Sequence, residues 1–241
     1  MALFREKFFP AASGALWLVF LFLDLTKTGD STWIKFTAIC LCCAAALTGA
    51  KSRDGQLVAL ALCFTVAADW FLLVWNRGYL LGICLFLVVQ GLYAYRLYLL
   101  RGSRPCRWGL AVRLLVPAAG FLLCAGFALW LLYSLFADGA LSLLLATFAV
   151  AGSFLTFLLP LIYFSALCVN CLEAFALSAP LRRFAWGLLL FVCCDVCVGL
   201  WNASALLPAP LAEFSRVGMW FFYLPSQVLI VLSQRLEGEH V

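Results

Sequence analysis

Apolar runs separated by short polar breaks follow one another along almost the whole chain. A helix that crosses a bilayer needs roughly 20 apolar residues, and each run is near or above that length. Irregular backbone cannot face lipid, so each run is predicted to form a helix. The eight predicted spans cover residues 9–25, 32–49, 56–75, 79–100, 110–136, 140–177, 183–202 and 213–234.

The segment 140–177 is longer than one span needs and is long enough to contain two. An extra span would carry Arg182 and Arg183 to the outer side of the membrane, against the tendency of Lys and Arg to remain in cytoplasmic loops. We therefore predict one long helix, with a kink or break near Gly152 or Pro160.

The basic residues fix the orientation of these spans. With eight spans and a cytoplasmic N-terminus, twelve of the 16 Lys and Arg residues fall on the cytoplasmic side, as the positive-inside tendency requires. We therefore predict an all-α integral membrane protein with its N- and C-termini in the cytoplasm. The four basic residues on the outer side are Lys27, Lys35, Arg77 and Arg216.

Composition supports the membrane class and argues against a nucleic-acid partner. Hydrophobic residues make up 66% of the chain, charged residues 11%, and the mean hydropathy is +1.09, far from the balance of a soluble domain. The net charge of +5 lies in short connections rather than on one face. We predict a single multi-pass bundle over 1–241, with halves 1–104 and 105–241, that lies among membrane lipids; in a bacterium it would occupy the plasma membrane.

The chain has 12 cysteines, nearly all of them within the predicted spans. The pairs Cys168/Cys171 and Cys194/Cys197 have a spacing that occurs in metal and redox sites. However, the single histidine is His240 at the tail, and free cysteine behaves as a small apolar residue in packed interiors. We expect no metal and no cofactor.

Two aspartates interrupt apolar runs at matching places. Asp69 and Asp195 are each followed at the same distance by Trp-Asn, ending at Asn76 and Asn202, so both features recur after 126 residues. A carboxyl group in hydrocarbon costs about 2.5–3.5 kcal/mol even on the lenient insertion scale, which points to a function. The repeat predicts a parallel 4+4 arrangement of helices, in which the two carboxyls face each other at equal depth.

Further polar residues share helical faces with these aspartates and predict an interior cavity. Each has a simpler explanation: a lysine can extend to the membrane surface, glutamines can join neighbouring helices, and tyrosines can anchor span ends. The candidate cavity residues are Lys35, Gln90, Tyr163, Tyr223 and Gln227.

The chain resembles the YhhN-like lysoplasmalogenase family of integral membrane proteins, over about two hundred residues. The matching segments are Trp33-Ile34-Lys35, Ala68-Asp69 through Gly82, Phe86 to Tyr93, Pro160 to Tyr163, Trp186 to Asp195, and Phe222 to Gln227. The resemblance implies an eight-helix bundle that hydrolyses the vinyl ether bond of a lysophospholipid, the lysoplasmalogen. The products would be a fatty aldehyde and glycerophosphoethanolamine or glycerophosphocholine.

Vinyl ether cleavage suits a pair of carboxyl groups. Protonation of the β-carbon leaves an oxocarbenium ion, to which water adds, so the reaction needs one protonated and one ionised carboxyl, as in glycoside hydrolysis. Two close, buried carboxyls retain one proton at neutral pH. We hypothesise that Asp69 and Asp195 are the acid/base pair, with the two roles unassigned. Because no histidine can activate a serine or cysteine, an acyl-enzyme mechanism is disfavoured.

The remaining candidate residues are expected to bind the substrate. Gln90, Gln227 and Tyr223 would orient water or the glycerol backbone, Lys35 would hold the lipid phosphate, and Tyr163 would line the same site.

Three departures from the family pattern keep a second function open. The family usually has Gly-Asp with a downstream His in the first half, where this chain has Ala68-Asp69 and Gln90; it usually has Ser-Asp in the second half, where this chain has Cys194-Asp195. The missing His removes a titrating group. The alternative is a non-catalytic or proton-coupled carrier of a lipid or small solute, since intramembrane carboxylates in repeated helices also suit transport.

Overall fold

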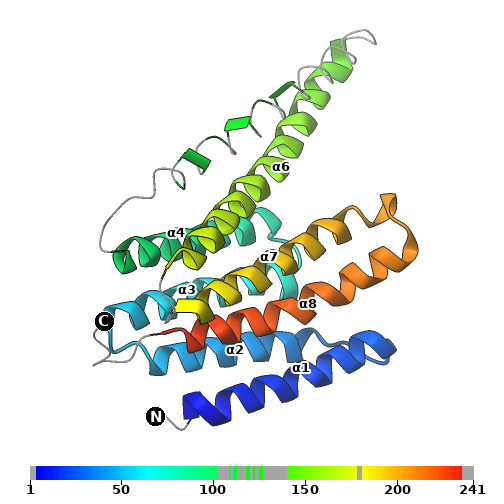
Figure 1. The fold of residues 1–241 in the computed structure, drawn as a ribbon. Helices are drawn as coiled ribbons and strands as arrows, with labels where there is room; N and C mark the ends of the chain where they lie inside the picture. Colours follow the sequence, from blue (N-terminus) through cyan, green and yellow to red (C-terminus); the bar gives the residue numbers. More distant parts are fainter. Residues whose placement is uncertain are drawn as a thin grey trace.

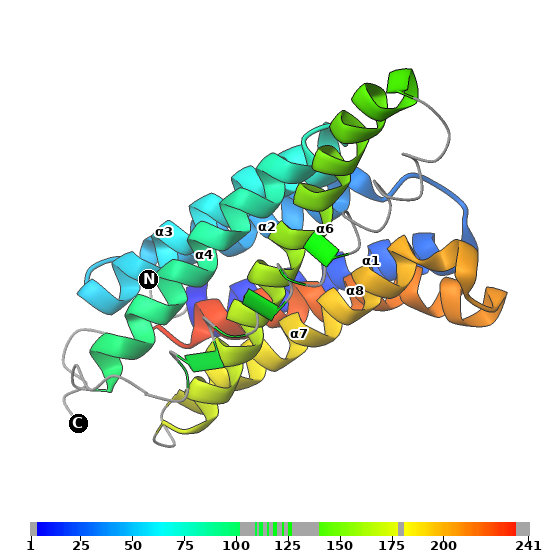
Figure 2. The ribbon, with the colours of Figure 1, turned by 90° about the horizontal axis from the view of Figure 1, so that it is seen from above.

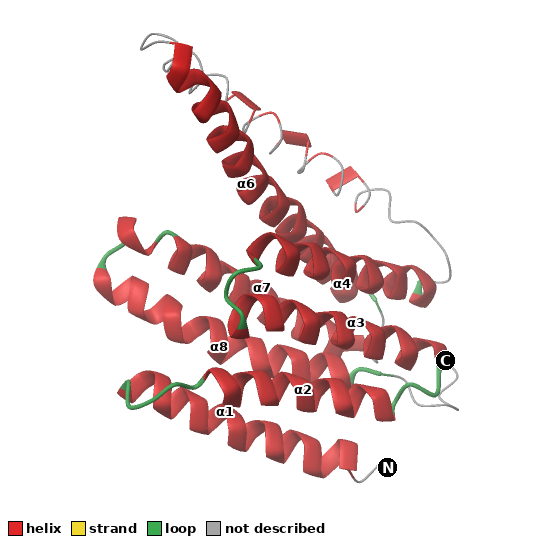
Figure 3. Ribbon diagram, turned by 180° about the vertical axis from the view of Figure 1, so that it is seen from behind, coloured by secondary structure: helices red, strands yellow, loops and turns green. Residues whose placement is uncertain are grey.

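The computed structural model describes residues 4–101, 140–177 and 181–234, together with scattered positions between 109 and 126. Helices joined by short loops make up this part of the chain, and no strand occurs in it (Figure 1, Figure 3). Its α-helices are α1 (Phe9–Thr26), α2 (Thr32–Thr48), α3 (Arg53–Asp69), α4 (Tyr79–Leu100), α6 (Ala140–Phe175), α7 (Arg182–Asn202) and α8 (Ala209–Leu232). Short π-helices precede α1 (η1, Phe4–Phe8) and follow α3 (η2, Trp70–Val74), and a 3-10 turn (η4, Ser204–Leu206) precedes α8.

The protein is an all-α, multi-pass membrane protein. Among the described residues, six helical segments are long and apolar enough to cross a bilayer, and α2 is a shorter apolar helix. The predicted span 110–136 lies outside the described residues apart from scattered positions. The six segments are Glu6–Thr26, Arg53–Val74, Tyr79–Leu100, Leu158–Phe175, Arg182–Asn202 and Ala209–Leu232.

The segment predicted as one long helix is one helix. α6 continues from Ala140 to Phe175 with Pro160 inside it, and the helix is unbroken at both Gly152 and Pro160. The predicted break at either residue is therefore absent.

The described helices form a closed ring. Along the chain, α1 packs on α2, α2 on α3, α3 on α4, α4 on α6, α6 on α7 and α7 on α8, and α8 returns to contact α1. α8 also touches α2 and α3. Figure 2 shows α6 lying over the space between α4 and α7. A ring of this kind encloses the inward faces of its helices, and that interior holds the polar residues described below.

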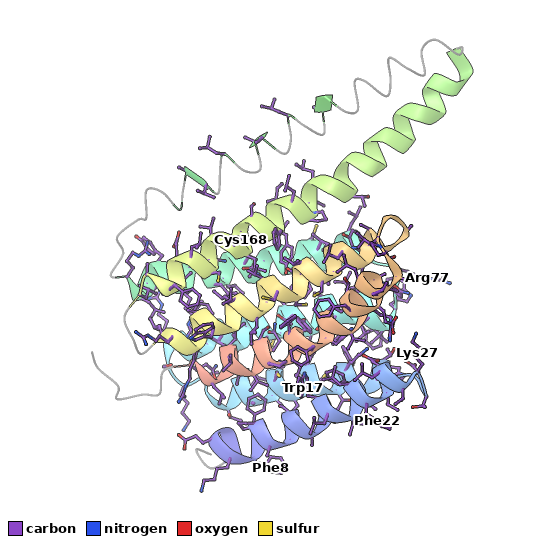
Figure 4. The ribbon with its side chains drawn as sticks, turned by 45° about the vertical axis from the view of Figure 1, so that its right-hand side comes forward. Phe8, Trp17, Phe22, Lys27, Arg77 and Cys168 are labelled. Carbon is purple, nitrogen blue, oxygen red and sulfur yellow. The ribbon has the colours of Figure 1, made fainter. Side chains whose placement is uncertain are left out.

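The helices alternate in direction from α1 to α4 and again from α6 to α8, and the described chain begins and ends at one end of the bundle, here called the termini end (Figure 1). α3 and α7 run in the same direction, away from the termini end (Figure 1). Lys27 and Arg77 lie together at the opposite end (Figure 4). Large apolar side chains such as Phe8 and Phe22 are exposed on the outer surface of the bundle, as a lipid-facing helix requires.

Candidate active site

Asp69 is the last residue of α3 and lies directly before the π-helical turn η2. Its side chain is buried. The turn closes with a hydrogen bond of 2.8 Å from the Trp75 amide to the Trp70 carbonyl. π-turns inside helices are rare and occur frequently at functional sites, because they rotate the side chains on one side of the turn relative to the other.

Close packing against α4 holds the π-turn in place. Leu72 of η2 lies over Gly82, where a Cβ atom would be 2.5 Å from the Leu72 Cγ. The connecting loop reverses direction at Asn76, which has a positive φ of 50°. Asparagine adopts this left-handed conformation more readily than most residues. Together, the loop and the glycine allow η2 to pack against α4 directly beyond Asp69.

Tyr223 of α8 binds the Asp69 carboxyl group. Its hydroxyl donates a hydrogen bond of 2.7 Å to Oδ2 of Asp69, and both side chains are buried. Pro225 follows two residues later inside α8. Since proline has no N–H, it cannot bond the carbonyl of Phe221 one turn earlier; the Trp17 indole donates to that carbonyl instead, at 3.2 Å. α1 thereby supports the turn of α8 that carries Tyr223.

Asp195 of α7 has an equivalent tyrosine partner. The Tyr163 hydroxyl, from α6, lies beside the Asp195 carboxyl group. Asp195 is only partly buried as a whole residue. Its Oδ2 atom is buried, however, and has no hydrogen-bond partner within the described part of the chain. One oxygen of this carboxyl group is therefore available to a ligand.

A cluster of aromatic rings joins the two Asp–Tyr pairs. Phe191 of α7 contacts the Tyr223 ring at a centroid distance of 5.6 Å and the Tyr163 ring at 6.5 Å. Phe86 of α4 completes the cluster, at 5.7 Å from Tyr163 and 5.8 Å from Phe191. The two pairs therefore border one apolar surface inside the ring of helices.

This arrangement can support acid/base chemistry on an apolar substrate. Each carboxyl group has a phenolic hydroxyl beside it, and the aromatic cluster gives a substrate chain a surface to rest on. Phe191 is part of the resembling segment, but the sequence did not mark it as a site residue. Its position one helical turn before Asp195 was the available signal.

Lys35 is close to this site but is already paired. Its ammonium lies 2.8 Å from Oδ2 of Asp24, which also accepts from the Ser31 hydroxyl through Oδ1 at 2.6 Å. The same ammonium lies over the Trp220 ring at 4.8 Å from the centroid. Trp220 in turn contacts the Tyr223 ring at 5.4 Å. Lys35 is therefore ion-paired within the bundle, and its expected contact with a lipid phosphate stays a prediction.

Gln90 and Gln227 are fully buried, one turn nearer the termini end than the aromatic cluster. Asn170 of α6 donates to Oε1 of Gln90 at 2.9 Å and to its backbone carbonyl at 3.0 Å. Gln227 donates to the Ser226 hydroxyl at 3.1 Å. Neither glutamine hydrogen-bonds to Asp69 or Asp195 among the described residues. Their expected role is therefore to orient substrate or water.

A buried ion pair near the termini end was not singled out by the sequence. Arg96 of α4 donates two hydrogen bonds to the Asp54 carboxylate, at 2.7 and 2.9 Å. It also donates to the hydroxyl and the carbonyl of Ser233 at 2.9 and 2.8 Å, and its guanidinium lies over the Phe184 ring at 4.4 Å. The available sequence signal was Arg96, an arginine inside an apolar run. The prediction of orientation counted this arginine only as a cytoplasmic basic residue.

The described residues contain no group of three or more His, Cys, Asp and Glu side chains placed to hold a metal ion. Their cysteines are free thiols. Cys43 and Cys63 approach each other most closely, with 3.6 Å between their sulfur atoms.

Comparison with known proteins identifies one family. The family model described as the YhhN family matches residues 31–234. This stretch runs from the start of α2 to the end of α8 and contains every site residue that the sequence predicted, whereas Trp17 and Asp24 of α1 precede it. No curated protein and no solved structure matches the chain.

Proposed function

The chain belongs to the YhhN family, and from this premise we propose that it is a membrane-embedded hydrolase that cleaves the vinyl ether bond of lysoplasmalogens. The products are a fatty aldehyde and a glycerophospho head group. Asp69 and Asp195 are the catalytic acid/base pair, Tyr223 and Tyr163 are their hydroxyl partners, and the aromatic cluster of Phe86 and Phe191 receives the alkenyl chain.

One observation carries the proposal. The Tyr223 hydroxyl bonds to Asp69 at 2.7 Å, and the Phe191 ring contacts both the Tyr223 ring and the ring of Tyr163, which lies beside Asp195. Two carboxyl groups of a hydrophobic bundle thus share one environment. A pair of this kind supplies the protonated and the ionised carboxyl group that vinyl ether hydrolysis requires.

The hydrogen bonds suggest how the two roles divide. Tyr223 donates to Asp69, which favours the ionised carboxylate, so we assign the general base to Asp69. Oδ2 of Asp195 has no partner in the described residues, which leaves it able to carry and deliver a proton, so we assign the general acid to Asp195. Proton transfer by positioned groups of this kind contributes about 10²–10⁴-fold to the rate.

The reaction proceeds by protonation, addition of water and loss of the alcohol. Asp195 transfers its proton to the β-carbon of the vinyl ether, and the C=C electron pair forms the new C–H bond, which leaves an oxocarbenium ion. Asp69 removes a proton from water as the water oxygen adds to the cationic carbon, and this yields a hemiacetal. Asp69 returns its proton to the glycerol oxygen as the C–O bond breaks and the alcohol leaves, and Asp195 takes the proton of the hemiacetal hydroxyl as the aldehyde C=O forms, which restores both carboxyl groups. One water molecule is consumed overall.

Lys35 is proposed to act at the head-group side. Lys35, together with Asp24, presents a charge pair near Trp220, which suits a head group that carries both a phosphate and an amine. Gln90 stands where the family usually has a histidine. Because the proposed acid and base are both aspartates, the reaction does not need that histidine to titrate.

The test is aldehyde release from lysoplasmenyl-ethanolamine by the purified full-length protein in lipid nanodiscs. Wild type is expected to release aldehyde, while Asp69→Asn and Asp195→Asn lose about 10²-fold or more of kcat. Asp30→Asn, an exposed aspartate in a loop, is the matched control and should retain wild-type activity. Wild-type protein that binds the lipid but releases no aldehyde would contradict the proposal.

The carrier alternative has a specific observation in its favour. The two aspartate-bearing helices α3 and α7 run in the same direction (Figure 1), as the parallel halves of some transporters do. Reconstituted vesicles distinguish the two functions. Uptake of lipid or solute that depends on a proton gradient, without aldehyde formation, would favour the carrier.

A further inference from the structure

Three polar atoms buried inside the ring, on α4 and α8, have no hydrogen-bond partner in the described part of the chain. They are Nε2 of Gln90, the hydroxyl of Tyr93 and Oε1 of Gln227, and their side chains are at most 1% exposed. A buried polar atom left unpaired costs about 1–3 kcal/mol, and in proteins most such atoms bind ordered water.

α4 and α8 are in register in this region. At the termini end, Arg96 donates to the hydroxyl and the carbonyl of Ser233 at 2.9 and 2.8 Å. Farther along, Phe86 of α4 and Tyr223 of α8 both contact Phe191, at 5.8 and 5.6 Å. The intervals Phe86 to Arg96 and Tyr223 to Ser233 are both ten residues, about 15 Å of helix each.

This register places the three unpaired atoms at similar depths inside the bundle. Gln90 follows Phe86 by four residues and Gln227 follows Tyr223 by four, so both amides lie one turn below the aromatic cluster, on the same faces as Phe86 and Tyr223. Tyr93 lies one turn nearer Arg96, with its ring against Phe184 of α7 at 5.4 Å. An amide N–H donates, an amide oxygen accepts, and a hydroxyl does both, so bridging water can satisfy all three atoms.

We propose that Gln90, Tyr93 and Gln227 form an internal water site that holds the water consumed in the reaction. This inference rests on the proposed function, in which water must reach a reaction centre inside the membrane. The site adjoins the proposed base, because Gln227 lies one turn from Tyr223 and Tyr223 binds Asp69. Tyr93, which the family resemblance covers but does not mark, becomes a positioning residue for this water.

A pocket at the termini end of the bundle lies near the proposed water site. A pocket of about 270 Å³ between α3 and α4 is lined by Arg53, Asp54, Leu57, Arg96, Leu99 and Leu100. Arg96 and Asp54 therefore border this pocket, and Arg96 is also one turn from Tyr93. We therefore infer that water enters from this end, past the ion pair of Arg96 and Asp54.

Radiolytic footprinting of the full-length protein in nanodiscs tests the site without reference to activity. Hydroxyl radicals produced from bound water label the side chains beside it, even when these are buried. Tyr93 should be labelled well above Phe9, which is fully buried among apolar side chains, and Gln227→Leu should abolish that labelling. Labelling of Tyr93 no higher than that of Phe9 would overturn the proposal.

Thermal stability and kinetics give two further readouts. In a dry site, Tyr93→Phe removes an unpaired hydroxyl and raises Tm; at a water site it removes a hydrogen bond, so we expect Tm to fall. We also expect kcat to fall roughly tenfold with KM for the lipid unchanged, the effect of one lost hydrogen bond. A higher Tm with wild-type kcat would overturn the proposal. Strong labelling of a wild type that releases no aldehyde would overturn the hydrolytic role together with the proposed function, but would leave the water site itself.

Discussion

The hydroxyl of Tyr223 donates a 2.7 Å hydrogen bond to Oδ2 of Asp69, which joins the last helix of the bundle to the third. The two residues are 154 positions apart in the chain, and both are buried. Tyr223 also contacts Trp220 and Phe191 through its ring. A single tyrosine therefore connects the carboxyl group, the aromatic cluster and the Trp220 ring over which Lys35 lies.

Replacement of Tyr223 by Phe should lower both stability and activity. The ring contacts remain, but a buried carboxyl group loses its hydrogen-bond donor, and hydrogen bonds to charged groups contribute about 1.5–3 kcal/mol. We expect Tm to fall and kcat for aldehyde release to fall about 10-fold to 100-fold. Thermal unfolding in detergent and the aldehyde assay measure the two effects.

Tyr98→Phe is the control for this substitution, because Tyr98 is an exposed tyrosine on α4. Its loss of a hydroxyl should leave both quantities unchanged. If Tyr223→Phe behaves as Tyr98→Phe does, the bond to Asp69 contributes neither to folding nor to the reaction.

Replacement of Gly82 by Ala should disturb the π-turn beyond Asp69. The added Cβ atom would lie 2.5 Å from the Leu72 Cγ, so η2 or α4 must move. Overpacking of this kind costs about 1–3 kcal/mol, and a displaced π-turn changes the position of Asp69. We therefore expect lower Tm and lower kcat, measured as above.

The same helix contains a matched control for that change. Gly91 of α4 has no atom within 4 Å of its Cβ position. Since alanine is favoured over glycine in helix interiors by about 1 kcal/mol, Gly91→Ala should keep or raise Tm. Equal losses at Gly82 and Gly91 would mean that the contact with Leu72 is unimportant.

Apolar length predicted most of the helices because the bilayer sets their span. The predictions 32–49 and 79–100 agree with Thr32–Thr48 and Tyr79–Leu100. The prediction 213–234 began too late, since α8 starts at Ala209. The prolines at its start, Pro208 and Pro210, were interpreted as a break between helices. Proline is tolerated in the first turn of a helix, however, because the backbone N–H there is unpaired in any case.

The sequence did not predict which charged residues pair with each other. A hydropathy pattern shows that Lys35, Asp24, Arg96 and Asp54 interrupt or flank apolar runs, but not which charge meets which. The pairs Lys35–Asp24 and Arg96–Asp54 depend on helix rotation and register. The π-turn after Asp69 also left no sequence signal, since it depends on packing against Gly82.

Disruption of the Arg96–Asp54 pair should strongly destabilise the bundle. Arg96 is 1% exposed, and removal of one partner of a buried pair leaves an uncompensated charge, at a cost of about 3–5 kcal/mol. We expect Asp54→Asn to lower Tm substantially. Glu213→Gln is the control, because Glu213 pairs with Lys27 and Arg216 at the exposed end of α8, where ion pairs contribute about 0–1 kcal/mol. Similar shifts in Tm for the two variants would contradict the importance of burial.

The four lysines of the chain provide a direct test of the predicted orientation. Lys27 is exposed at the end opposite the termini. Lys7, in η1 before α1, and Lys51, in the loop that joins the end of α2 to the start of α3, are exposed at the termini end. Lys35 is buried in its pair with Asp24. If both termini are cytoplasmic, a membrane-impermeant amine reagent applied to intact cells or right-side-out vesicles should label Lys27 alone. Permeabilised membranes should add Lys7 and Lys51, while Lys35 stays unlabelled as long as its ion pair is intact. Labelling of Lys51 but not Lys27 before permeabilisation would reverse the orientation and would place the entrance of the proposed water path on the outer side of the membrane.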